Sequence, residues 1–143
     1  WSGDQGSVGI CQWLPPRSDN LEAYANSVSG SKTDIAIQAA FILEEGTSSG
    51  TYEDSQAVTC FNFLKDTDTI NSVKKAADYF TALYERCYNQ DTWEDVKSAC
   101  ANSSWLTLDR FSQEPNICNS KYYLDTPSRR GYAESYYSCL LKI

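Results

Sequence analysis

Apolar residues recur along this chain at intervals of three and four positions, the spacing that places side chains on one face of an α-helix. The clearest such segment extends from about Ile70 to Cys87. Its apolar positions are Val73, Ala76, Ala77, Phe80, Leu83, Tyr84 and Cys87. No long stretch alternates between apolar and polar residues, as a half-buried β-strand would. The pattern therefore predicts an all-α fold, or nearly so.

Two segments nearer the start of the chain are also predicted to be helices. The first begins at Asp19, which with Glu22 has the spacing of a capping box, and it ends at Gly30. Its apolar stripe is Leu21, Tyr24, Ala25 and Val28. The second runs from about Asp34 to Glu45 and is apolar nearly all round, which is the pattern of a central, buried helix.

Weaker periodic signals predict shorter helices in the rest of the chain. One is expected from about Ser55 to Leu64. Asp91 and Glu94 repeat the capping-box spacing ahead of another. A last helix is expected to start near Ser128. One face of that helix would carry Tyr132, Tyr136, Cys139, Leu140 and Ile143.

The charge and length of the chain limit which partners and how many domains it is expected to have. The formal net charge is −7, from 19 acidic against 12 basic residues, and the basic residues are scattered, which argues against nucleic acid. No apolar run approaches the roughly 20 residues of a membrane span. At 143 residues the chain is expected to form a single domain over residues 1–143. Because it contains no methionine, we interpret it as a processed product or a fragment of a longer protein.

The six cysteines and one sequon indicate an oxidising environment. The cysteines are Cys11, Cys60, Cys87, Cys100, Cys118 and Cys139. Because the chain has no histidine, a zinc site would need several distant thiolates to converge, so we expect three disulfides and no metal, with the pairing left open. Asn102 opens an Asn-Ser-Ser glycosylation sequon. Together these features predict a secreted, extracellular glycoprotein.

The absence of histidine also excludes Ser-His-Asp and Cys-His catalysis. No glycine-rich phosphate loop is present, and no cofactor is expected. Carboxylate chemistry remains, and it suits glycoside hydrolysis. The 4 Trp, 10 Tyr and 5 Phe residues would suit sugar binding, although most single aromatic residues are expected to lie in the core.

Four motifs, in order, resemble those of the phage tail lysozyme family. The first is G-S-V-G-I-C-Q-W at residues 6–13, followed by Arg17 and by Tyr24-Ala25. The second is Q-A-A-F at residues 38–41, followed by Glu45. The third is A-A-D-Y-F at residues 76–80, followed by Y-E-R-C at residues 84–87, where the family usually ends in proline. The fourth is the closing helix, with Arg130, Ala133, Tyr136 and Tyr137.

The resemblance implies a compact, lysozyme-like helical domain of about five to six helices that cleaves the β-1,4 bond of peptidoglycan after N-acetylmuramic acid. It also implies that Gly9, Gln12 and Trp13 line the substrate-binding site; the alternative is a structural turn with a buried tryptophan. In the family the proton donor is a glutamate in a helix that precedes the glycine-rich turn. That position would fall before Trp1, so we expect the catalytic helix to be absent from the printed chain.

Three carboxylates are candidates for a replacement acid. Glu44 and Glu45 end an apolar helix, where poor solvation would raise a carboxyl pKa. The favoured alternative for them is a glutamate that accepts hydrogen bonds from backbone amides or a nearby arginine. Asp4 lies on the side of the glycine-rich turn where the family's acid is found, and the alternative for it is a solvated loop residue.

Two functions from different classes therefore stay open, and catalytic activity is undecided. The first is a muramidase, or the larger part of one, acting on peptidoglycan. The second is a non-catalytic, secreted glycan-binding or structural protein derived from the same fold and able to self-assemble. The acidic charge favours the second, because enzymes that act on anionic walls gain from opposite charge.

Overall fold

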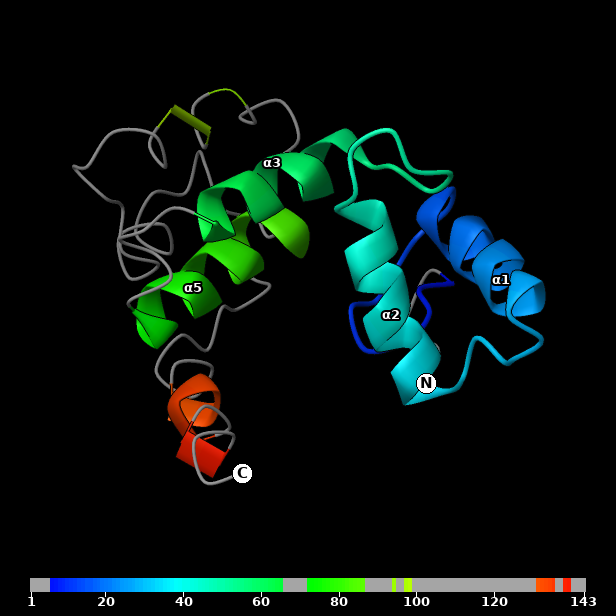
Figure 1. Ribbon diagram of the computed structural model, residues 1–143, viewed down its shortest axis with the longest axis horizontal. Helices are drawn as coiled ribbons and strands as arrows, with labels where there is room; N and C mark the ends of the chain where they lie inside the picture. Colours follow the sequence, from blue (N-terminus) through cyan, green and yellow to red (C-terminus); the bar gives the residue numbers. More distant parts are fainter. Residues whose placement is uncertain are drawn as a thin grey trace. The chain divides into compact units, whose positions relative to one another are not determined.

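The computed structural model describes residues 6–65, 72–86, 94, 97–98, 131–135 and 138–139. Its named helices are α1 (Arg17–Ser27), α2 (Ile35–Glu45), α3 (Ser55–Leu64), α5 (Val73–Tyr79) and the π-helix η1 (Phe80–Tyr84) (Figure 1). Over the described ranges no strand forms, and one isolated bridge joins Val8 to Trp13. The prediction of an all-α fold is confirmed for this part of the chain. None of its helices has the length and apolar character needed to cross a membrane.

The contacts divide the chain into two compact units, Trp1–Val58 and Thr59–Ile143. The division does not test the prediction of one domain over residues 1–143, which stays a prediction.

The core of the first unit is a cluster of aromatic rings between α1 and α2. The ring of Phe41 from α2 lies 5.7 Å from that of Trp13 and 5.8 Å from that of Tyr24, centroid to centroid. Tyr52 follows α2 in the chain, and its ring lies 5.6 Å from Tyr24 and 6.0 Å from Phe41. Trp13 and Phe41 are buried, as are Leu21 and Ala25 of α1, while Tyr24 and Tyr52 are half-buried. Each such ring pair adds about 0.5–1.5 kcal/mol beyond burial of its area.

The start of α1 differs from the prediction. The helix begins at Arg17, and its N-cap residue is Pro16, which offers no side-chain cap. Asp19 therefore lies inside the first turn, where its charge still favours the positive end of the helix dipole. The expected stripe is only partly buried: Leu21 and Ala25 are buried, whereas Val28 is exposed.

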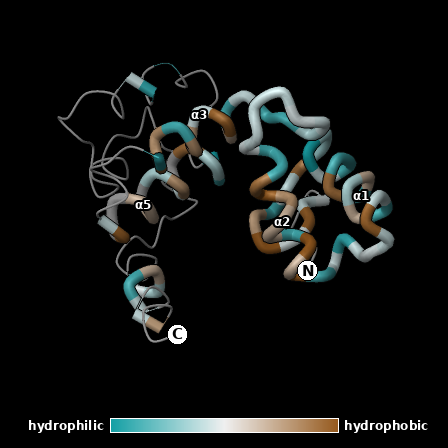
Figure 2. Tube along the Cα trace, viewed as in Figure 1, coloured by the Kyte–Doolittle hydropathy of each residue, from teal (hydrophilic) through white to brown (hydrophobic). Residues whose placement is uncertain are grey.

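The prediction that the helix at residues 34–45 is buried all round is wrong. The helix α2 buries Gln38, Phe41 and Glu45, while Ile35 and Leu43 are 68% and 60% exposed. Figure 2 shows its mainly hydrophobic colouring. The physical reason is that the helix packs through one face only, and two polar side chains occupy that face because the structure supplies hydrogen-bond partners for both.

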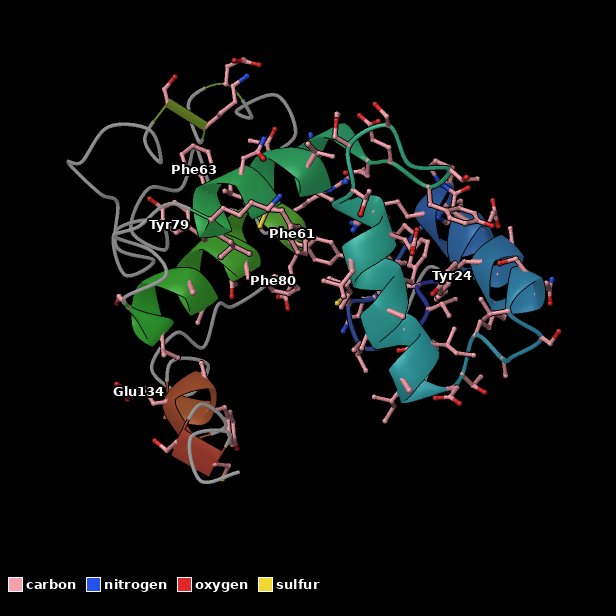
Figure 3. The ribbon with its side chains drawn as sticks, viewed as in Figure 1. Tyr24, Phe61, Phe63, Tyr79, Phe80 and Glu134 are labelled. Carbon is pink, nitrogen blue, oxygen red and sulfur yellow. The ribbon has the colours of Figure 1, made fainter. Side chains whose placement is uncertain are left out.

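The second unit is built on α5 and the C-terminal part of α3. Phe63 and Tyr79 stack with ring centroids 5.3 Å apart, and the thiol of buried Cys60 lies 3.8 Å from the carbonyl oxygen of Tyr79 (Figure 3). The short helix predicted at residues 55–64 is confirmed.

The helix predicted from Ile70 to Cys87 changes character within its length. The α-helical turns end at Tyr79 and a π-helix continues to Tyr84, where the Glu85 N–H donates to the Phe80 carbonyl. The Thr81 hydroxyl donates to the Ala77 carbonyl at 2.8 Å, a contact that competes with the regular ladder. A simple 3.6-residue period cannot reveal this widening.

The last predicted helix lies partly outside the described residues. Residues 131–135 and 138–139 are helical, and Tyr132 and Cys139 are exposed. Shared spacing shows that side chains lie on one face but not that another element covers them. Most of the helix expected after Asp91 also lies outside the residues that the structure describes.

Three of the six cysteines are described, and none is joined by a disulfide to another described cysteine: they are Cys11, Cys60 and Cys139. Cys87, Cys100 and Cys118 lie outside the described residues. Neither the three predicted disulfides nor the expected number of helices is supported by the described part, and both stay predictions.

Replacing Asp54 by alanine is expected to destabilise the protein by about 1 kcal/mol, because this is the usual cost of removing the N-cap side chain of a helix, here α3. One carboxylate oxygen of Asp54 accepts hydrogen bonds from the backbone N–H groups of Gln56 and Ala57, at 3.1 and 2.9 Å. Urea unfolding measures the effect. Asp54→Asn keeps the acceptor and should stay near wild type; an equal loss in both variants would contradict a capping role.

Candidate functional site

A short closed turn precedes α1, and we call residues 8–13 the Gly9 turn. The backbones of Val8 and Trp13 exchange two hydrogen bonds, with N···O distances of 2.9 and 2.8 Å. The Gln12 N–H also donates to the Gly9 carbonyl at 3.1 Å. The backbone therefore fixes both ends of the turn and leaves its tip projecting.

Gly9 is required by both conformation and space. Its φ is +75°, a region that residues with a Cβ atom rarely adopt. A Cβ atom there would lie 2.8 Å from Cζ3 of Trp13 and 2.9 Å from Oε1 of Gln38. Both neighbours are buried, so neither can move aside without disturbing the core.

Gln38 ties the turn to α2. Its side-chain oxygen accepts a hydrogen bond from the Ile10 backbone N–H at 2.9 Å, and its amide nitrogen donates to the Lys32 carbonyl at 2.6 Å. The residue is 4% exposed. Both ends of its amide are thus satisfied inside the protein, as a buried amide requires.

Glu45 lies at the centre of a buried polar network. Arg17 donates from Nε to Oε1 at 2.6 Å and from Nη2 to Oε2 at 2.8 Å, a two-point ion pair. The indole Nε1 of Trp13 donates to Oε2 at 3.1 Å. Glu45 is 0% exposed, and the arginine compensates its charge. The network fixes the end of the Gly9 turn against both helices.

Gln12 is the last residue of the turn before Trp13, and its conformation is strained. Its φ is 52°, in the left-handed region, and its side chain is exposed. Two exposed apolar residues, Ile10 and Leu14, lie two positions before and after it in the sequence. Strain of this kind costs about 1–3 kcal/mol, persists only where the surroundings enforce it, and gathers at ligand sites.

The sequence comparison assigns the chain to a family. The profile described as phage tail lysozyme matches residues 1–140. The chain belongs to this family. No curated protein and no solved structure matches the chain. The resemblance found in the four motifs is thereby confirmed, and the function is lysozyme-like and related to muramidases in general.

In this phage tail lysozyme family member the three predicted substrate-binding residues lie together in the Gly9 turn, but only Gln12 presents its side chain. Trp13 is 1% exposed and its ring packs against Phe41, so the indole is a core element in this structure rather than an open stacking face. Gly9 is buried and has no side chain to offer.

The candidate acids have very different surroundings. The contacts of Glu45 match the structural alternative, a carboxylate that anchors through a nearby arginine. Glu44 is half-buried, and its carbonyl accepts from Thr47. Asp4 and the sequon residue Asn102 lie outside the described residues. No group of three potential metal ligands gathers within the described segments.

The sequence did not indicate that Gln38 and Arg17 contact the Gly9 turn and its network. Both belonged to the family motifs, but nothing in the motifs assigned them contacts. The usable signal was the position of Gln38 on the same helix face as Phe41 and Glu45, because a polar residue on an inward face needs a partner.

Proposed function

We propose that this domain recognises peptidoglycan through the Gly9 turn and serves muramidase chemistry, as the whole of the enzyme or its larger part. Membership of the phage tail lysozyme family supports the glycan and the reaction class. The observation that carries the proposal for this turn is Gln12, which is exposed and has a positive φ although the turn around it is anchored.

Gln12 has the chemistry that sugar recognition needs. Its amide offers two donors and an acceptor, which match the hydroxyl and N-acetyl groups of a glycan. Ile10 and Leu14 add exposed apolar surface, 54% and 48% exposed, that suits the apolar faces and methyl groups of N-acetylated sugars. A preformed loop also avoids the entropy cost of ordering on binding.

Hydrolysis of the β-1,4 bond requires a carboxylic acid that can reach the leaving oxygen. Glu45 is poorly suited, because it is buried and its two carboxylate oxygens already accept three hydrogen bonds. We therefore leave the general acid unassigned among Glu44, Asp4 and the glutamate position that the family places before the turn.

Incubation with purified, insoluble peptidoglycan tests the proposal. Binding is measured by co-sedimentation, and cleavage by release of soluble muropeptides with new N-acetylmuramic acid reducing ends. Binding with release supports the muramidase. A chain that neither sediments with peptidoglycan nor releases muropeptides would contradict the proposed function.

The second candidate is a non-catalytic glycan-binding or assembly-forming protein, and it is favoured by the engagement of Glu45 in the ion pair with Arg17. Binding without release in the same experiment would support it. Sedimentation velocity over a concentration series would reveal self-assembly.

We also propose that the protein works outside the cell, with its cysteines paired and Asn102 glycosylated. The even cysteine count and the sequon support this environment. Intact masses before and after reduction, and before and after deglycosylation, test both modifications. An unchanged mass in both comparisons would contradict them.

Replacing Gln12 by glycine is expected to separate stability from binding. Glycine accepts the positive φ without strain, so the free energy of unfolding should stay unchanged or rise by up to about 1 kcal/mol. Loss of one or two hydrogen bonds should weaken peptidoglycan binding about 3- to 30-fold. The control Asn26→Ala changes an exposed polar residue of α1 and should bind as wild type. Undiminished binding by the Gln12 variant would contradict the role of the turn.

A further inference from the structure

The buried face of α2 carries two polar side chains that both reach the Gly9 turn. Gln38 and Glu45 are 4% and 0% exposed, and they share this face with Phe41. Burying an amide and a carboxylate among apolar side chains is costly unless each is satisfied. Both side chains have hydrogen-bond partners in the Gly9 turn: Gln38 accepts from the Ile10 N–H, and Glu45 accepts from the Trp13 indole.

The two contacts fix the turn on either side of Gln12. Gln38 accepts from the Ile10 N–H, and Glu45 accepts from the Trp13 indole. Because both anchors belong to one helix, the distance between them is set by the rigid backbone of α2. Gln38 is itself held by the Lys32 carbonyl, which restricts the rotation of its amide.

The strained conformation of Gln12 requires such an arrangement. A glutamine with φ of 52° returns to an ordinary conformation unless its surroundings prevent it. The backbone hydrogen bonds between Val8 and Trp13, and the one from Gln12 to Gly9, close the turn, but none of them involves the Ile10 N–H in its inner segment. The additional bond to Ile10, two residues before Gln12, restrains that inner segment directly.

We infer that Gln38 and Glu45 are positioning residues, which hold the Gly9 turn in one conformation so that Gln12 is presented to the glycan. This inference rests on the proposed function for its ligand, but the holding of the turn can be measured without ligand. Neither residue touches the glycan in this account. Their effect on affinity comes from the fraction of molecules in which the turn has its binding conformation.

The principal test is Gln38→Met, which keeps the length of the side chain and removes its acceptor and donor. We expect hydrogen exchange of the Ile10 amide to accelerate at least about tenfold, and peptidoglycan affinity to fall about tenfold, as a binding conformer reduced to about one tenth would give. Glu45→Gln, compared with Glu22→Gln at an exposed position of α1, is the second variant and decides the question if Gln38→Met does not fold.

Tyr52→Leu is the matched control for general destabilisation. It weakens the same aromatic core at a residue whose ring contacts are with Tyr24 and Phe41. At equal fractions folded, it should bind as wild type and keep the Ile10 amide protected. The inference is wrong if the Ile10 amide of the Gln38 variant exchanges at the wild-type rate. It is also wrong if the wild-type protein binds peptidoglycan and the Gln38 variant binds it equally tightly. If wild-type protein binds no peptidoglycan, the proposed function fails, and the exchange of Ile10 alone decides the inference.

Discussion

Replacement of Arg17 by methionine is expected to destabilise the protein by about 3–5 kcal/mol, the usual result of removing one partner from a buried ion pair. Glu45 would keep its charge in a site with no exposure and would lose its two-point ion pair with the guanidinium, while the Trp13 indole would still donate to it. Because small domains are stable by only about 5–15 kcal/mol, the first unit should unfold at markedly lower urea concentration.

The chain contains a matched control for this experiment. Lys32 and Glu22 form an ion pair of similar length, 2.9 Å, but their side chains are 38% and 55% exposed. Lys32→Met should therefore cost no more than about 1 kcal/mol. The double variant Arg17→Met with Glu45→Leu should recover much of the lost stability, since no charge is left buried. Equal effects of Arg17→Met and Lys32→Met would show that the buried network does not stabilise this fold.

Replacement of Gly9 by alanine is expected to cost about 2–4 kcal/mol, because it combines an unfavourable φ with overpacking. The new Cβ atom would lie 2.8 Å from the Trp13 ring and 2.9 Å from the Gln38 oxygen that holds Ile10. The variant should therefore lose both stability and the ordered turn, which thermal unfolding and exchange of the Ile10 amide measure.

Gly6 separates the two causes. Its φ is +80°, close to that of Gly9, but a Cβ atom there would meet no atom within 4 Å. Gly6→Ala should thus show the conformational cost alone, about 1–2 kcal/mol. A Gly9→Ala variant no less stable than Gly6→Ala would contradict the close packing of Trp13 and Gln38 on the turn.

The sequence predicted the helices well where one apolar stripe was sufficient. The short helix at residues 55–64 is an example for its boundaries, which agree with the structure, although its fully buried residues are Ala57 and Cys60. For α2 the sequence predicted the bounds but not the burial, because its apolar residues surround the helix while only one face is buried. Hydrophobicity could not show that Gln38 and Glu45 point inward, since their burial depends on partners that are distant in the sequence.

The structure shows where the candidate site residues lie, and their binding of substrate stays a prediction. The motif placed Gly9, Gln12 and Trp13 together, and the structure confirms that they share one turn. The spacing could not show that Trp13 faces the core, because adjacent residues of a tight turn point in unrelated directions. The π-helix at residues 80–84 could not be predicted from the sequence either. It depends on a shift of the backbone hydrogen bonds rather than on a pattern of side chains.

The central claim, that the Gly9 turn of this lysozyme family member binds peptidoglycan, is tested most directly by NMR. A soluble tetrasaccharide of alternating N-acetylglucosamine and N-acetylmuramic acid is titrated into the isotope-labelled protein. We expect the largest shifts at the backbone amides of Ile10, Gln12 and Leu14 and at the Gln12 side-chain amide. Saturable shifts confined to other parts of the chain, or no shifts at all, would contradict it.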